Sequence, residues 1–199
     1  MADKRKKKEE EKLGWQKSVL LYAHDMVYLL LTVMLLFLLV FRIIVVSGGS
    51  MRMTLLDGDY LLLLNNTFYH TPQQGDVVVI SKESFDNGKP IVKRVIATEG
   101  QTVDIDFENG IVYVDDTALA EDYINAPTTV NGGVSFPLTV AQGCIFVLGD
   151  NRGISKDSRY PDVGQIDKRE VLGKAILLMY PGTDGGTYLR DFNRVGAVK

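Results

Sequence analysis

The longest uncharged stretch of the chain limits its fold more than any other feature. Residues Met26 to Phe41 carry no charged side chain, and after Arg42 the apolar character continues to Val46. At about 1.5 Å rise per residue, a helix over residues 26–46 would cross the roughly 30 Å hydrocarbon layer of a bilayer. A buried core helix would usually carry a polar stripe, and none is present between Met26 and Phe41. We therefore predict one transmembrane helix, residues 26–46.

A cleavable signal peptide is the main alternative for this run, because small residues, Ser47, Gly48 and Gly49, follow it. The run, however, exceeds the about 7 to 15 apolar residues of a signal-peptide core. Arg42 would also lie unusually close to the cut. These two observations favour an uncleaved anchor.

The two sides of this helix differ in charge. Residues 1–17 hold seven of the 22 basic and four of the 25 acidic side chains, so the remainder of the chain is net acidic. Basic flanks of a membrane span stay cytoplasmic. We predict a basic cytoplasmic segment over residues 1–25, with its charged amino end disordered, and a domain of residues 47–199 on the outer face of the cell (cytoplasmic) membrane. An acidic main body without a basic stripe argues against nucleic acid as a partner.

Beyond Asp57 the chain alternates short runs of apolar, often β-branched residues with turn residues, which is typical of strands. The candidate strands are residues 59–64, 76–80, 91–98, 102–107, 111–116, 144–150 and 171–180. Glu108, Asn109 and Gly110 separate two of these runs and predict a hairpin. No helical periodicity is evident after Val46. We therefore predict a mainly β fold, an antiparallel sheet or barrel-like domain behind one N-terminal transmembrane helix.

Ser50 follows the predicted span by four residues and raises the question of a nucleophile. The chain has two histidines, His24 beside the span and His70 in the sequence NNTFYHTPQQ, for which we predict a loop, so a histidine base has little support. A lysine can serve instead where an apolar setting lowers its pKa. Lys93 fits, because it lies within the apolar run 91–96; the alternative is a solvent-facing lysine on an edge strand.

Four sequence blocks, in order, resemble type I signal peptidases (bacterial leader peptidases), the membrane-bound Ser-Lys endopeptidases that remove signal peptides from exported proteins. The blocks are GGSMRMTLLDGD, GDVVVI, VKRVIATEGQTV and LGDNRGISKDSRY, with GKAILLMYP following. The last block is the most specific. Together with the amino-terminal anchor, the resemblance covers nearly the whole chain.

The resemblance implies that Ser50 is the nucleophile and Lys93 the general base. Ser155 occupies the place of a serine that hydrogen-bonds and orients the lysine. The other supporting residues it implies are Gly49 and Met51, which flank the nucleophile, and Asp157 and Arg159, which match a structural ion pair.

The resemblance also assigns Asp150, Asn151 and Arg152 to a GDNR turn. Gly48 stands where some members place a serine in the oxyanion hole, so the developing oxyanion would depend on the Ser50 backbone N–H. No cofactor, organic or metal, is implied, and the single cysteine excludes both an internal disulfide and a cysteine-rich zinc site.

Met53 is the main departure, because the family usually has proline at that place. The expected function is a serine endopeptidase that cuts signal-peptide-bearing preproteins after small residues, with the lipid bilayer as its other partner in protein secretion. The alternative is a non-catalytic or specialised relative that assists assembly of surface proteins, and Met53 keeps it open. A Ser-Lys autoprotease of the regulator type is disfavoured because the chain has a span and no DNA-binding segment. The identity of the preproteins and the oligomeric state stay open.

Overall fold

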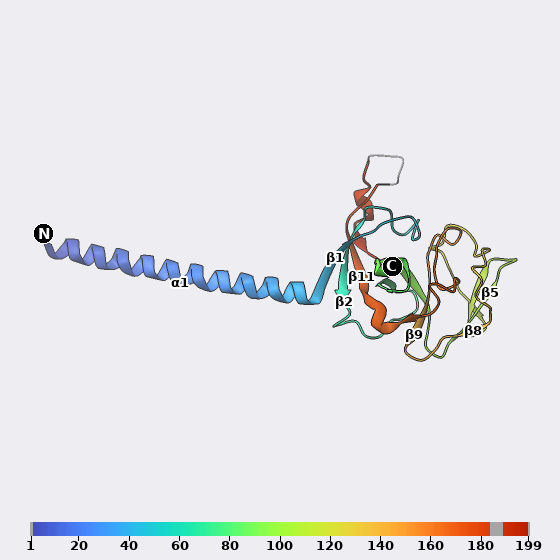
Figure 1. The fold of residues 1–199 in the computed structure, drawn as a ribbon. Helices are drawn as coiled ribbons and strands as arrows, with labels where there is room; N and C mark the ends of the chain where they lie inside the picture. Colours follow the sequence, from blue (N-terminus) through green and yellow to red (C-terminus); the bar gives the residue numbers. More distant parts are fainter. Residues whose placement is uncertain (1, 184–188, 199) are drawn as a thin grey trace. The chain divides into compact units, whose positions relative to one another are not determined.

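The computed structural model of the chain describes residues 2–183 and 189–198. The chain divides into a helical unit that ends at Val40 and a β-rich unit that begins at Phe41. The helical unit is a single helix, α1, Ala2–Val40 (Figure 1). Its segment Gly14–Val40 is, among the described residues, the one helix long and apolar enough to cross a membrane.

Helix α1 corrects two of the expectations. It begins at Ala2, so the charged amino end is helical rather than disordered, in keeping with the strong helix propensity of Lys, Glu and Arg. It also ends at Val40, six residues before the predicted end at Val46, because residues 41–45 form a strand. The β-branched residues Ile43, Ile44 and Val45 suit a strand better than a helix. Ser50 therefore follows the last residue of the helix by ten positions rather than four.

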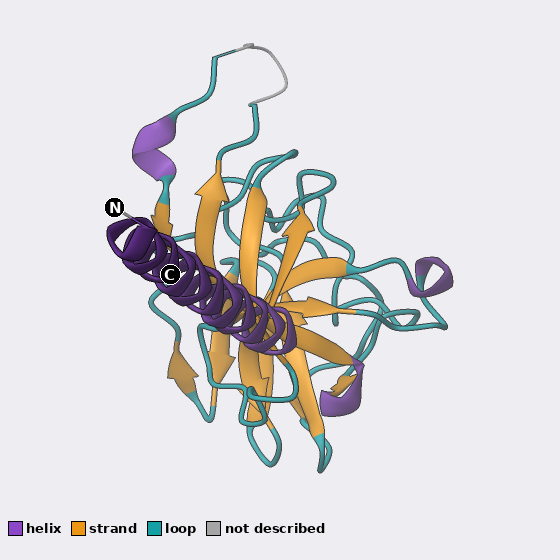
Figure 2. Cartoon of the chain, turned by 90° about the vertical axis from the view of Figure 1, so that its left-hand side faces the viewer, coloured by secondary structure: helices purple, strands orange, loops and turns teal. Residues whose placement is uncertain are grey.

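The strands of the β-rich unit are, in chain order, β1 Phe41–Val45, β2 Tyr60–Asn65, β3 Val77–Ile80, β4 Ile91–Thr98, β5 Thr102–Asp106, β6 Ile111–Val114, β7 Thr117–Ala118, β8 Leu138–Thr139, β9 Cys144–Leu148, β10 Ile166–Asp167, β11 Val171–Tyr180 and β12 Gly196–Ala197. Three short 3-10 helices lie in the connections, η1 Asp86–Gly88, η2 Lys168–Glu170 and η3 Phe192–Arg194. Figure 2 shows that strands, in orange, make up the body of this unit and that its helical turns are short.

The strands form two sheets in which every pairing is antiparallel. The larger has the order β1-β2-β11-β3-β4-β9-β10, with β12 also pairing with β11, and the smaller has the order β7-β6-β5-β8. The predicted hairpin is present, with Asp106 opposite Ile111. All seven predicted strands are found, and the mainly antiparallel β fold class is confirmed. The two-residue strands were not predicted.

The central strands of the larger sheet are covered on both faces. All four residues of β3 are buried, and so are the six inner residues of β4. One apolar cluster packs the smaller sheet against β4 and β9, with Ile105 and Phe146 among its members. In Figure 1 the smaller sheet, which carries the labels β5 and β8, lies beyond β9. Strand β4 therefore places Lys93 and Arg94 in the buried interior of the unit.

Candidate active site

Ser50 and Lys93 meet in the β-rich unit. Ser50 lies in the turn between β1 and β2, and Lys93 is the third residue of β4. The Lys93 amine donates to Ser50 Oγ at 2.8 Å and to the Val92 carbonyl at 3.0 Å. The structure therefore brings the two predicted reacting groups within hydrogen-bond distance across 43 residues of sequence.

The turn around Ser50 is held through its carbonyl groups. The Asn151 backbone N–H donates to the Ser50 carbonyl at 2.9 Å, and its side-chain Nδ2 donates to the Gly49 carbonyl at 3.0 Å. On the other side of the serine, Met51 is buried in the core of the larger sheet. Among the described residues, the Ser50 N–H donates to no acceptor, so it stays available to an oxygen atom of a bound ligand.

Lys93 is only 3% exposed, and this burial is the largest influence on its pKa. Loss of hydration disfavours the ammonium form and lowers the pKa from 10.5 to about 8. Asp157 and Asp150 oppose this change by attraction, whereas the Arg159 guanidinium adds to it. About a tenth of the amine is therefore neutral at pH 7, far more than for a lysine with its ordinary pKa.

Ser155 lies beside the nucleophile turn without making the predicted hydrogen bond. Its Oγ is buried and has no hydrogen-bond partner among the described residues, so the bond to Lys93 is not formed in this structure. The Ser155 side chain fills the space above Gly149: a Cβ atom on Gly149 would overlap it and would also lie 2.6 Å from the Ser50 carbonyl oxygen. Glycine at position 149 therefore allows the Ser155 side chain and the Ser50 carbonyl oxygen to lie against the backbone of residue 149.

Asp157 and Arg159 form the predicted ion pair, fully buried. Arg159 donates from Nε and Nη2 to the two carboxylate oxygens at 2.8 and 2.9 Å. The Gly149 N–H also donates to Asp157, at 3.0 Å, and Arg159 reaches the carbonyl of Arg152 at 2.9 Å. The pair therefore fixes the loop that carries Ser155.

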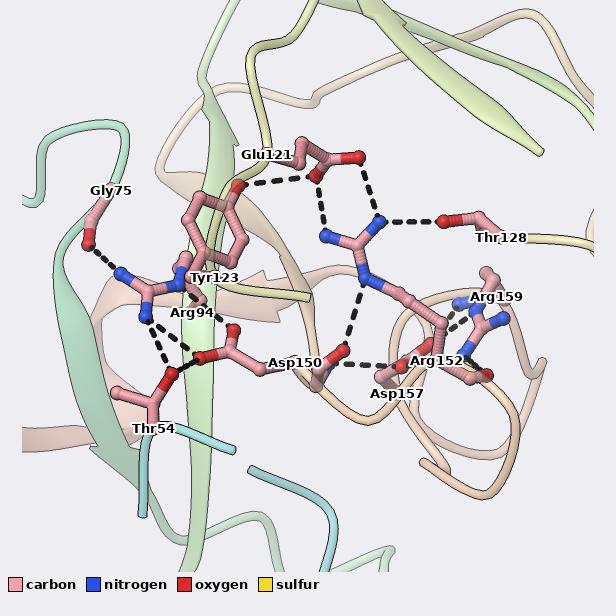
Figure 3. Close-up of polar contacts among 11 residues, drawn as sticks. Thr54, Gly75, Arg94, Glu121, Tyr123, Thr128, Asp150, Arg152, Asp157 and Arg159 are labelled. Carbon is pink, nitrogen blue, oxygen red and sulfur yellow. Dashed lines mark hydrogen bonds and ion pairs between the residues drawn. The ribbon is translucent and has the colours of Figure 1, made fainter. Parts of the chain in front are cut away.

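A second buried ion pair joins β4 to the GDNR turn. Arg94 donates from Nε and Nη2 to Asp150 at 2.8 and 2.7 Å, and from Nη1 to the Gly75 carbonyl at 2.9 Å (Figure 3). The Thr54 hydroxyl donates to the same carboxylate at 2.5 Å. Because Thr54 follows Ser50 by four residues, this pair ties the nucleophile turn to the strand that carries Lys93.

A third pair reaches across to the smaller-sheet side of the unit. Arg152 donates to both carboxylate oxygens of Glu121, and its guanidinium also contacts the Thr128 hydroxyl (Figure 3). Sequence reasoning missed Glu121 and Thr128, because they lie in a loop where neither spacing nor motif marks them. Arg94, Arg152 and Arg159 thus each have a carboxylate partner.

His70 plays no part in this arrangement. His70 lines a separate pocket of about 240 Å³ with Tyr69, Pro72 and Lys168, among others, and Ser50 does not line that pocket. Among the side chains that the structure describes, in residues 14–183 and 189–198, no group of three or more His, Cys, Asp or Glu is placed to hold a metal ion.

The chemistry of this arrangement follows from its geometry. A neutral amine 2.8 Å from a hydroxyl can accept the hydroxyl proton while the oxygen attacks an electrophilic carbon. A serine paired in this way with a lysine is the arrangement that Ser-Lys hydrolases use in place of the histidine triad. Comparison with known proteins identifies the family. The family model described as "Signal peptidase, peptidase S26" matches residues 19–180, so the chain belongs to that family.

Individual relatives carry the same name. The probable signal peptidase I-1 of Synechocystis sp. is 36% identical over 124 residues, which cover 59% of this chain and 60% of that protein. The probable signal peptidase I of Mycobacterium leprae is 36% identical over 121 residues, covering 48% of this chain and 41% of that protein. A crystal structure of a signal peptidase I from Enterococcus faecalis V583 aligns with 32% identity and a TM-score of 0.43, covering 52% of this chain and 96% of that one. The chain thus spans less than two thirds of the length of the two relatives.

Proposed function

We propose that this chain is a membrane-anchored serine endopeptidase that removes signal peptides from exported preproteins. The observation that carries the proposal is the 2.8 Å contact between Ser50 Oγ and the buried amine of Lys93. Membership of the signal peptidase family supports signal-peptide removal, and the names of the relatives support the same activity.

In the proposed reaction Ser50 Oγ attacks the carbonyl carbon of the scissile peptide bond. Lys93 accepts the hydroxyl proton and then protonates the amine that leaves as the tetrahedral intermediate collapses. Water frees the acyl-enzyme by the same route, with Lys93 now accepting the proton of water. No metal or organic cofactor takes part in these steps.

The Ser50 N–H is the proposed donor to the oxyanion. It has no acceptor among the described residues, and the carbonyls of Gly49 and Ser50 are both held by Asn151. A donor fixed before the reaction stabilises the developing charge without reorganising during it. Ser155 would support the reaction by orienting Lys93 once its hydroxyl turns toward the amine, as the family resemblance implies.

The proposal includes the placement of the chain at the membrane. Helix α1 would cross the cell membrane once, with the basic amino end in the cytoplasm and the β-rich unit on the outer face. Its partners would then be the bilayer and preproteins that carry a signal peptide in that bilayer. Holding enzyme and substrate in one membrane would raise their effective concentration.

The test is incubation of the detergent-solubilised full chain with a labelled preprotein, followed by separation of precursor and mature forms. Wild type should produce the mature form, and Ser50→Ala should produce none. Lys93→Arg should also be inactive, because a guanidinium stays protonated and cannot accept the serine proton. A folded wild-type protein that leaves every tested preprotein intact would instead favour the non-catalytic alternative.

A further inference from the structure

A loop of the smaller-sheet side contacts the active-site network at several points. Residues 121–128, which we call the bracing loop, lie between β7 and β8 and form neither helix nor strand. Four of their side chains contact residues next to the catalytic pair in sequence or space. None of the four belongs to the blocks that resemble the signal peptidase family.

Glu121 and Thr128 anchor the two ends of the bracing loop on one guanidinium. Arg152 donates to the Glu121 carboxylate at 2.5 and 3.0 Å and to the Thr128 hydroxyl at 2.6 Å. The same arginine donates from Nε to the Gly149 carbonyl at 3.0 Å. Bidentate pairs of this kind fix geometry as well as charge, so the loop is attached firmly to the GDNR turn.

Tyr123 covers a second guanidinium. The centre of its ring lies 4.0 Å from the Arg94 guanidinium carbon, within the range of a cation–π contact. Its hydroxyl donates to Glu121 at 3.1 Å, which keeps the ring in this position (Figure 3). The bracing loop therefore also shields the Arg94–Asp150 pair from water.

Asn125 makes the contact closest to the nucleophile. Its Nδ2 donates to Asn151 Oδ1 at 2.9 Å, while Asn151 Nδ2 donates to the Gly49 carbonyl. The two ends of an amide have opposite hydrogen-bond roles. With its oxygen engaged by Asn125, the Asn151 amide must turn its nitrogen toward Gly49; the reverse orientation would place two oxygen atoms against each other.

We propose that Asn125 is a positioning residue, which acts through Asn151 to hold the Gly49–Ser50 backbone in the orientation that leaves the Ser50 N–H free for the oxyanion. The inference rests on the proposed function, since it gives Ser50 the role of nucleophile. Glu121, Tyr123 and Thr128 keep the bracing loop in place for this contact. The loop sets the geometry of the nucleophile turn and touches no reacting atom.

The substitution that reverses this contact is Asn125→Asp, which keeps the shape of the side chain, exchanges the donor for an acceptor and adds a negative charge, which the Asn131→Asp control below also adds. Asn151 would then turn its amide nitrogen toward residue 125 and its oxygen toward Gly49. We expect kcat to fall about 3- to 10-fold, the rate equivalent of one hydrogen bond, with KM little changed. Asn125→Ala removes the donor without adding a competing acceptor, so its loss should be smaller.

Matched controls are Asn131→Asp and Asn131→Ala. Asn131 is exposed, lies just beyond the bracing loop, and accepts a local hydrogen bond from the Gly133 N–H. Both controls should keep wild-type kcat and KM. A double-mutant cycle adds a second test: in an Asn151→Ala background, Asn125→Asp should cause no further loss, because the group through which it acts is gone.

Amide hydrogen exchange tests the positioning step separately from catalysis. In Asn125→Asp, peptides that cover residues 48–52 and 149–153 should exchange faster than in wild type, and in the Asn131 controls they should not. Unchanged kcat and exchange in Asn125→Asp, or losses that add fully with Asn151→Ala, would overturn the inference while leaving the proposed function intact. If wild type cleaves no preprotein, the proposed function fails, and the exchange measurement still decides whether Asn125 holds the turn.

Discussion

The burial of Lys93 makes the pH dependence of cleavage a quantitative prediction. With a pKa of about 8, roughly 9% of the amine is neutral at pH 7, whereas an amine that titrates near 10.5 is only about 0.03% neutral. The burial of Lys93 therefore increases the neutral fraction of its amine at pH 7 roughly 300-fold. We expect kcat/KM to rise with pH along an acidic limb whose apparent pKa is about 8.

The assay is the initial rate of cleavage of a fluorogenic peptide, taken from a preprotein cleavage site, by the detergent-solubilised full chain from about pH 6 to pH 10. His70→Ala should keep the limb, because that side chain lies in a separate pocket. Lys93→Ala should show no turnover at any pH. Two results would refute the reasoning: a limb near pH 6.5 that disappears in His70→Ala, or retained cleavage by Lys93→Ala.

Three further outcomes are expected. Burial of Lys93 lowers the stability of the fold below about pH 8, where the lysine is protonated in both the folded and the unfolded state, and this cost declines as the pH rises toward 10.5. Lys93→Met should therefore raise the free energy of unfolding at pH 7 by up to about 3 kcal/mol, as measured by denaturant titration. A lower free energy of unfolding in Lys93→Met would contradict this. Asp157→Ala leaves the buried Arg159 unpaired and should cost about 3–5 kcal/mol, so an unchanged melting temperature would speak against it. Met53→Pro should keep cleavage rates at or above wild type, because Met53 is 69% exposed and its N–H has no acceptor among the described residues; a folded but slow variant would reverse that expectation.

The strands could be predicted from the sequence because local composition and burial agree. Strand β4 is the clearest case: its β-branched run begins and ends at the predicted residues and is buried throughout its interior. The end of α1 could not be predicted in the same way. Residues 41–45 are as apolar as the helix before them, and hydropathy alone does not separate a membrane span from a strand that pairs with β2. The β-branched Ile43, Ile44 and Val45 were the available signal.

Of the candidate site, only the residues that lie within recognisable sequence blocks could be predicted. The resemblance of their sequence blocks to signal peptidases assigned Ser50 and Lys93, the scarcity of histidine and the apolar run around the lysine supported that assignment, and the structure places the two in contact. Asn125 and Glu121 gave no such signal, because their partners are distant in sequence. A loop also has no periodicity from which the direction of a side chain could be predicted. The Ser155 hydroxyl was predicted to reach Lys93 and does not do so in this structure, since a side-chain rotation is not encoded in a motif.

Gly149 has a consequence for how sequences of this kind can diverge. Its missing side chain leaves a space that the Ser155 side chain occupies, so the two positions share one side-chain volume. A smaller residue at 155 would empty that volume but would not make alanine acceptable at 149, because the Ser50 carbonyl oxygen, a backbone atom, would still lie 2.6 Å from the new carbon. A smaller side chain at position 155 is therefore compatible with the packing, whereas a larger residue at position 149 is not. Among chains that keep this turn, packing alone admits other small residues at position 155, whereas it confines position 149 to glycine.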